Sequence, residues 1–287
     1  LSLHDALPIS SPGAAASPQT PVNADVTHFD VLIVGAGLSG IGSAWRLQKE
    51  CPTKTYAILE GRQSIGGTWD LFRYPGIRSD SDMYTLGYSF RPWTNAKAIA
   101  DGPSILSYVR DTAREACIDR HIRFGHKVTA ADWSSQDARW TLTAETAEGV
   151  RRFTCSFLFM CTGYYRYEST SNPDFPGQDR FRGQIVHPQF WPEGLDYAGK
   201  KVVVIGSGAT AVTIVPEMAK TAQHVAMLQR SPTYVVSRPS QDGIANSLRK
   251  MLPSKAAYGV TRWKNVLLQQ YFYKRARNKP EETKKTL

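Results

Sequence analysis

The chain has 287 residues, of which 41% are hydrophobic and 21% charged, a composition typical of a globular protein with room for about two domains. The formal net charge of +10 is spread along the sequence apart from one cationic cluster near its end, and this spread disfavours a nucleic-acid-binding function. The four cysteines form neither a Cys-x-x-Cys pair nor a zinc-type spacing, which argues against a redox-active dithiol and a disulfide framework, and no metal site is expected.

The longest apolar runs are far shorter than the ~20 residues that cross a bilayer. We therefore expect a cytoplasmic protein without stable membrane insertion, and the unpaired cysteines fit a reducing compartment. Residues 1–27 are rich in Pro, Ser and Ala without periodicity, so we expect a disordered or non-native leader. Its first ten residues resemble translated sequencing adapter. Because the chain also stops within a charged, helix-like stretch from Arg262 to Leu287, we interpret it as an N-terminal fragment.

The first predicted unit begins at His28. The apolar run Phe29–Val34 predicts a buried strand, Ile41–Glu50 a helix and Thr55–Leu59 a second strand. The turn after the first strand reads Gly-x-Gly-x-x-Gly, whose glycines permit a tight turn, close approach to a pyrophosphate and close helix–strand packing. An acid at the end of the second strand suits an adenosine ribose, and a plain surface acid is the alternative. The predicted dinucleotide-binding residues are Gly35, Gly37, Ser39, Gly40 and Glu60.

A second unit repeats this order. The strand Lys200–Ile205 runs into another glycine-rich turn, a helix is predicted from Ala211 towards Lys220, and His224–Leu228 predicts the next strand. After this strand, Arg230 and Ser231 stand where the first unit has an acid. A cation and a hydroxyl suit a ribose 2′-phosphate, and an exposed surface arginine is the alternative. The predicted binding residues are Gly206, Ser207, Gly208, Ala209, Thr210, Ala211, Val212, Thr213, Arg230 and Ser231.

The two units therefore favour different nucleotides, FAD at the first and NADPH at the second. Two such sites in one chain predict hydride transfer from a nicotinamide to a flavin. Simple dehydrogenases need one site, and disulfide reductases need a cysteine pair that the sequence lacks. The expected fold class is α/β with two Rossmann-like dinucleotide-binding domains, the FAD domain being incomplete at its C-terminal end.

Residues 61–163 are expected to complete the first domain. Gly-Gly-Thr-Trp at 66–69 offers compact backbone and a flat aromatic for packing beside a flavin, and a cation and a carboxylate follow the turn at residues 75–76. An alternating stretch over 120–128 and a strand over 153–160 return the chain to the sheet. A core position for Trp69 and a local Arg78–Asp80 ion pair are the alternatives. The predicted cofactor-binding residues here are Gly67, Thr68, Trp69, Asp70, Leu71, Arg78, Ser79, Asp80 and Val128.

The segment Phe181–Pro192, FRGQIVHPQFWP, resembles the fingerprint of the Baeyer–Villiger monooxygenases, Phe-x-Gly-x-x-x-His-x-x-x-Trp-Pro. It matches every fixed position and precedes the second glycine-rich turn, as it does in that family. The run Gly66–Trp93 and the segments 208–213 and 229–234 are similar to the subgroup that contains the ethionamide-activating monooxygenase of mycobacteria.

This resemblance implies that NADPH reduces FAD, that O2 adds to give a peroxyflavin, and that a ketone becomes an ester or lactone or a sulfur atom is oxygenated. It implies that Asp80 positions an active-site arginine beyond residue 287. It also implies that His187 couples the two domains, with a plain buried histidine as the alternative. The expected segments are a leader at 1–27, the FAD domain at 28–165, a linker with the fingerprint at 166–198 and the NADP domain at 199–287.

Two other readings stay open. One is a flavin-containing N- or S-monooxygenase without ketone insertion, which the Trp-Pro ending of the fingerprint disfavours. The other is an inactive truncated fragment. The natural substrate and the oligomeric state do not follow from the sequence.

Overall fold

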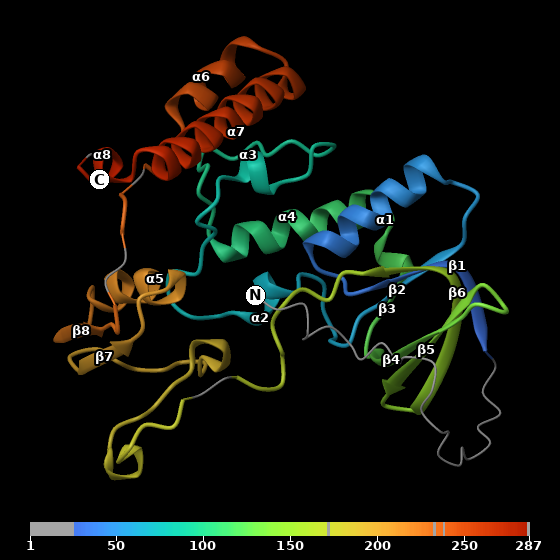
Figure 1. The fold of residues 1–287 in the computed structure, drawn as a ribbon, viewed down its shortest axis with the longest axis horizontal. Helices are drawn as coiled ribbons and strands as arrows, with labels where there is room; N and C mark the ends of the chain where they lie inside the picture. Colours follow the sequence, from blue (N-terminus) through green and yellow to red (C-terminus); the bar gives the residue numbers. More distant parts are fainter. Residues whose placement is uncertain (1–25, 171–172, 232–233, 238, 286–287) are drawn as a thin grey trace. The chain divides into compact units, whose positions relative to one another are not determined.

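The computed structural model describes residues 26–170, 173–231, 234–237 and 239–285 (Figure 1). The chain divides into two compact units, of which the first runs to Leu71 and resumes over Leu106–Pro176, while the second comprises Phe72–Ile105 and Gly177–Leu287. Residues 72–105 thus group with the C-terminal part of the chain, whereas the sequence prediction assigned them to the first domain. The predicted leader lies outside the described residues up to position 25.

The first unit is built on a six-stranded mixed sheet with the strand order β3-β2-β1-β6-β5-β4. The strands β1, β2, β3 and β6 run parallel, and β4 and β5 extend the sheet as an antiparallel hairpin next to β6. The strands are β1 Thr27–Val34, β2 Tyr56–Leu59, β3 Ile122–Arg123, β4 Lys127–Ser134, β5 Arg139–Thr146 and β6 Gly149–Met160.

The predicted βαβ order of the first unit is confirmed. β1 carries the buried apolar run, α1 (Leu38–Glu50) packs its small residues Gly40 and Ala44 inward, and β2 is buried at all four positions. The prediction for residues 120–128 as one stretch was wrong, because a 3-10 turn (η2, Asp119–His121), the short β3 and a loop precede β4. The remaining helices that contribute to this unit are α2 (Thr68–Leu71) and most of α4 (Gly102–Glu115).

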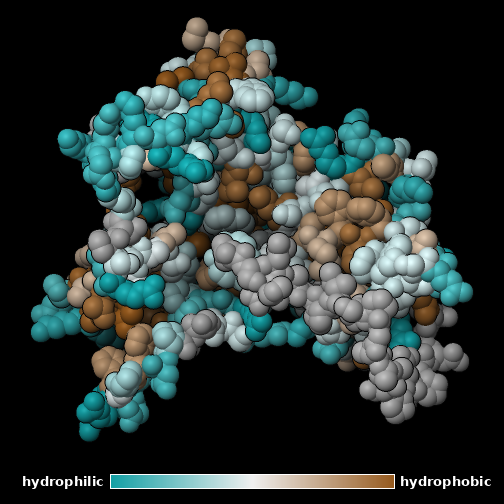
Figure 2. All heavy atoms as spheres, viewed as in Figure 1, coloured by the Kyte–Doolittle hydropathy of each residue, from teal (hydrophilic) through white to brown (hydrophobic). Residues whose placement is uncertain are grey.

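The second unit holds a parallel pair of strands, β7 (Lys201–Ile205) and β8 (His224–Leu228), joined by the helix α5 (Ala209–Met218). The second βαβ unit is therefore confirmed as well. Figure 2 shows hydrophobic side chains at the surface over these strands, where Val203, Ile205 and Leu228 are all more than half exposed. The other elements of this unit are α3 Met83–Leu86, η3 Gln178–Arg180, η4 Pro188–Phe190, α6 Gly243–Met251, α7 Ser254–Asn278 and α8 Pro280–Lys284.

Candidate cofactor-binding site

The glycine-rich turn after β1 is sterically restricted to glycine at two positions. Gly35 has φ +105°, and a Cβ added there would lie 2.5 Å from the carbonyl oxygen of Cys161. A Cβ on Gly40 would lie 1.9 Å from the carbonyl oxygen of Gly35. The Gly35 N–H donates to the carbonyl of Leu59 at 2.8 Å, which fixes the turn to the end of β2. The fingerprint glycines thus meet the packing demands expected of them.

The turn leads directly into the N-terminus of α1. Gly37 is the N-cap residue in extended conformation, and no side chain caps this 13-residue helix. The first-turn N–H groups of a helix lack intrahelical acceptors and carry a partial positive charge. Backbone N–H groups at Ser39 and Gly40 are consequently placed where an anionic phosphate is favoured.

Glu60 follows β2 and is 5% exposed. One carboxylate oxygen accepts from the Ala36 N–H at 2.7 Å, and the other accepts from the Arg62 N–H at 2.9 Å. The carboxylate therefore holds the glycine-rich turn as well as its own strand end. Each oxygen keeps further acceptor capacity, so the predicted contact with a ribose hydroxyl is compatible with these two bonds.

A second tight turn, at Gly66 and Gly67, meets the first. The Gly66 N–H donates to the Ala36 carbonyl at 3.1 Å. Gly67 has φ +54°, and a Cβ added to it would come within 3.3 Å of the Gly37 Cα. The structure thereby brings the predicted residues of the first site together, and α2 places Thr68, Trp69 and Leu71 immediately after this junction.

Asp70 lies in a polar cluster that sequence reasoning missed. Its side chain is 4% exposed and contacts Arg62 at 2.8 Å, Arg110 at 2.9 Å and the hydroxyl of Ser64 at 2.5 Å. Arg62 also donates to the Gly67 carbonyl at 3.4 Å. These contacts occupy both carboxylate oxygens and support a positioning role for Asp70 in the Gly66–Gly67 turn.

The glycine-rich turn of the second unit repeats the geometry of the first. Gly206 has φ +126°, and its N–H donates to the carbonyl of Leu228 at 2.8 Å, just as Gly35 bonds to Leu59. Gly208 is the N-cap of α5, again without a capping side chain. Ser207, Ala209, Thr210 and Val212 lie at the turn and in the first turns of the helix, whereas Ala211 and Thr213 are buried.

The strand ends of the two units differ in charge. The buried Glu60 follows β2, whereas Arg230 and Ser231 are exposed two and three residues after β8. Arg230 makes no ion pair with any residue of the described part of the chain. Its guanidinium is accordingly available to an anionic ligand.

The predicted site residues outside the turns are placed as follows. Asp80 is 59% exposed and lies 3.7 Å from the guanidinium of Arg78, so the local ion pair exists in a loose form. Ser79 is buried, and its hydroxyl donates to the Ser81 carbonyl at 2.8 Å. Val128 sits in β4 with its side chain in the core of the first unit.

His187 is the N-cap of the 3-10 turn η4 within the fingerprint segment. Its Nδ1 accepts from the Gln189 N–H at 3.2 Å, and burial lowers the pKa of its imidazole below the ordinary value. Both features favour the neutral ring. Its predicted role in coupling the domains stays a prediction.

Within the described ranges, no group of three or more His, Cys, Asp or Glu side chains is arranged to hold a metal ion. The four cysteines are free thiols. None of the described helices combines the length and the apolar character needed to cross a membrane.

Comparison with known proteins decides the family. A family model described as flavin-binding monooxygenase-like matches residues 93–280, and a model of the NAD(P)-binding Rossmann-like domain matches residues 33–101. The chain belongs to the flavin-binding monooxygenase-like family. The α/β Rossmann-like fold class and the resemblance noted from the sequence are confirmed by these matches.

Similar proteins refine this placement within the family. The chain is 59% identical over 259 residues to the FAD-containing monooxygenase EthA of Mycobacterium tuberculosis, covering 90% of this chain and 53% of that protein. A steroid monooxygenase solved with NADP aligns with a TM-score of 0.68 at 33% identity, over 81% of this chain and 43% of the other. A cyclohexanone monooxygenase solved with ε-caprolactone aligns with a TM-score of 0.70 at 28% identity, over 82% and 45%. The chain thus spans about half the length of the relatives that it matches.

Proposed function

We propose that this chain forms the FAD- and NADPH-binding part of a Baeyer–Villiger monooxygenase, which inserts one oxygen atom of O2 into a ketone to give an ester or lactone. The observation that carries the proposal is the pair of βαβ units with the same turn geometry and opposite charge at the strand end. Buried Glu60 ends the first unit and exposed Arg230 follows the second. One chain then offers a site for each of two nucleotides.

FAD fits the first unit on steric and electrostatic grounds. Gly35 and Gly40 leave no room for a Cβ, and the first turn of α1 presents backbone N–H groups to a pyrophosphate. Glu60 would accept the ribose hydroxyls, and the Gly66–Gly67 turn would lie against the cofactor. The bound flavin supplies the activation of O2 once a nicotinamide has reduced it. The name of EthA as an FAD-containing monooxygenase supports this assignment.

NADPH fits the second unit. The uncapped N-terminus of α5 would receive the pyrophosphate, and Arg230 would pair with the 2′-phosphate that distinguishes NADPH from NADH. Ser231 would add a hydrogen bond to the same phosphate. Support comes from the similar steroid monooxygenase that was solved with NADP.

Ketone insertion is the finer part of the proposal. It is supported by the Trp191–Pro192 ending of the fingerprint and by likeness to a cyclohexanone monooxygenase that was solved with a lactone. Asp80 would act by electrostatics, because its exposed carboxylate would orient a cationic side chain of the active site. A cytoplasmic location fits the free thiols and belongs to the same proposal.

The test supplies the full-length protein with FAD and NADPH and compares the products that it makes from cyclohexanone and from a thioether. The variant Asp80→Asn is assayed in the same way. We expect lactone from the ketone. Asp80→Asn keeps the side-chain shape and should retain FAD but lose on the order of a hundredfold in oxygenation, because a preorganised charge is removed. Sulfoxide without any lactone would favour a monooxygenase that does not insert oxygen into ketones. Asp80→Asn oxygenation within about threefold of wild type would leave Asp80 as a surface ion-pair residue.

A further inference from the structure

The helix α3, which follows Asp80 in the second unit, is too short to hold its own conformation. It has four residues, Met83–Leu86, and helices of this length are not stable alone. The preceding backbone is anchored by the Ser79 N–H on the Ala100 carbonyl at 3.0 Å, and Met83 donates to Ala98 at 2.8 Å. The conformation of residues 80–87 therefore depends on contacts from elsewhere.

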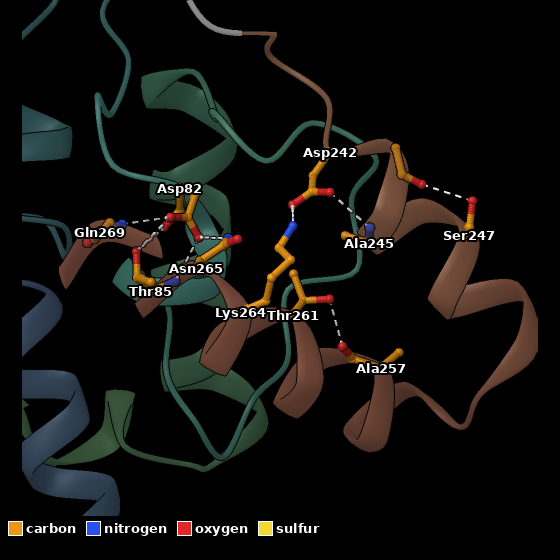
Figure 3. A network of polar contacts seen from close by, with 11 residues as sticks. Asp82, Thr85, Asp242, Ala245, Ser247, Ala257, Thr261, Lys264, Asn265 and Gln269 are labelled. Atoms are coloured by element: carbon orange, nitrogen blue, oxygen red, sulfur yellow. Dashed lines mark hydrogen bonds and ion pairs between the residues drawn. The ribbon is translucent and has the colours of Figure 1, made fainter. Parts of the chain in front are cut away.

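The long helix α7 supplies these contacts at the N-terminal end of α3. Asp82, 8% exposed, caps α3 by accepting from the Thr85 N–H at 3.1 Å. The same carboxylate accepts from the side-chain amide of Asn265 at 2.9 Å and from that of Gln269 at 3.3 Å (Figure 3). Asn265 is itself only 9% exposed, so the contact is shielded from water.

The same face of α7 binds the opposite end of α3. Arg262 donates to the Tyr84 carbonyl at 2.7 Å, and the Tyr258 hydroxyl lies 3.2 Å from the Tyr88 carbonyl. A cation beside the last carbonyls of a helix is favoured by their partial negative charge. Both ends of α3 are thus held by α7, although about 180 residues separate them in sequence.

Asp82 differs in one respect from the other capping aspartate that contacts α7. Asp242 caps α6 by accepting from the Ala245 N–H at 3.0 Å, and its second oxygen pairs with Lys264 at 2.6 Å (Figure 3). Among the described residues Asp82 forms no ion pair, and its hydrogen-bond partners are the neutral donors Thr85, Asn265 and Gln269. A buried carboxylate without a cation depends on each of its hydrogen bonds.

We propose that Asp82 and Asn265 are positioning residues, through which α7 holds the segment that carries Asp80 in its working conformation. This inference rests on the proposed function for its catalytic consequence, but its structural part stands by itself. Asp82 lies two residues after Asp80, so release of the cap frees the chain directly behind the Asp80 carboxylate.

The test first adds a carboxylate at position 265 and then exchanges the carboxylate and the amide between positions 82 and 265. Asn265→Asp places a second buried carboxylate against Asp82, and we expect hydrogen exchange of the amides at 80–87 to accelerate at least ~10-fold, because a buried hydrogen bond to a charge is replaced by repulsion. The double variant Asp82→Asn/Asn265→Asp restores one carboxylate and one amide and should return exchange to within about threefold of wild type. Gln270→Glu, the same chemical change at an exposed position of α7, should have no effect.

Each outcome decides the proposal. Unchanged exchange in Asn265→Asp, or a double variant no better than the single one, would overturn it. If Asn265→Asp unfolds, the double variant still decides, because recovery of the fold requires the 82–265 pairing. Reduction of bound flavin by NADPH in the full chain should persist in Asn265→Asp while more NADPH is diverted to hydrogen peroxide. Faster exchange without increased hydrogen peroxide would support the positioning of residues 80–87 by α7 but would exclude Asp80 from the proposed chemistry.

Discussion

The Asp70 cluster offers the sharpest test of how the first site is held. Asp70→Asn keeps the shape of the side chain but removes the charge that faces Arg62 and Arg110. In either orientation the amide NH2 group must then face Arg62 or Arg110, whose guanidinium groups can only donate. The substitution should loosen the turn at Gly67, because Arg62 also donates to the carbonyl of that residue.

The magnitude follows from burial. Breaking a fully buried pair by removing one partner costs about 3–5 kcal/mol. Here the carboxylate is 4% exposed, but Arg62 and Arg110 are 29% and 47% exposed and can turn to water. We therefore expect a loss of about 2 kcal/mol in the free energy of unfolding of the first unit, with about tenfold weaker FAD binding if the turn contacts the cofactor.

The helix α4 provides a matched control. Asp111 neighbours Arg110, is 31% exposed and pairs with Arg114 within one turn, so Asp111→Asn should cost no more than ~1 kcal/mol. Urea unfolding and flavin titration of the full chain measure both effects. If Asp70→Asn and Asp111→Asn lose the same small amount of stability, the cluster does not hold the turn and the reasoning fails.

Three further predictions use other parts of the sites. Gly40→Ala should prevent folding, since its Cβ would lie 1.9 Å from the Gly35 carbonyl, whereas Gly37→Ala, with 3.7 Å to the nearest atom, should fold normally; thermal melting of both separates them. Arg230→Ala should lower the NADPH-to-NADH preference in flavin reduction by roughly tenfold to a hundredfold, and an unchanged ratio would exclude Arg230 from the site. Burial lowers the pKa of His187, so the folded state binds fewer protons than the unfolded one and stability should fall as the pH drops from about 6.5 through the folded pKa. His187→Asn should weaken the dependence of the melting temperature on pH between pH 5 and 8. The same dependence in the variant and in wild type would contradict the prediction.

The sequence alone predicted the structure where the interacting residues belong to one short βαβ segment. The strands β1, β2, β7 and β8 and the helices between them follow from apolar runs interrupted by glycine, because a βαβ unit brings its own strand ends together. The Gly35–Leu59 and Gly206–Leu228 hydrogen bonds are consequences of that local order. The predicted site residues near these turns accordingly lie where the motif placed them.

The sequence was not sufficient where distant segments meet. Nothing in the local pattern around Asp70 indicates that Arg110, 40 residues later, reaches its carboxylate. The register of the β4–β5 hairpin also escaped prediction, because Lys127–Ser134 lacks a regular alternation and its pairing shifts between Val128 and Ala130. Long-range partners of a charge have no signature in a single sequence.

The Asp80 segment was placed in the FAD domain by the domain prediction, whereas in the structure it groups with the C-terminal part of the chain. The residues from 72 to 105 follow the Gly66–Gly67 turn directly, so sequence order assigns them to the first domain. Their backbone instead pairs with Ser240, which accepts from the Ala98 N–H at 2.8 Å, and their short helix depends on Asn265 and Arg262 of α7. The segment that carries Asp80 is therefore held by α7 of its own unit. A substitution that loosens α7 should therefore change the position of Asp80 while both glycine-rich turns stay intact. Such a variant should lose oxygenation but keep its cofactor affinity, which distinguishes a positioning defect from a cofactor-binding defect.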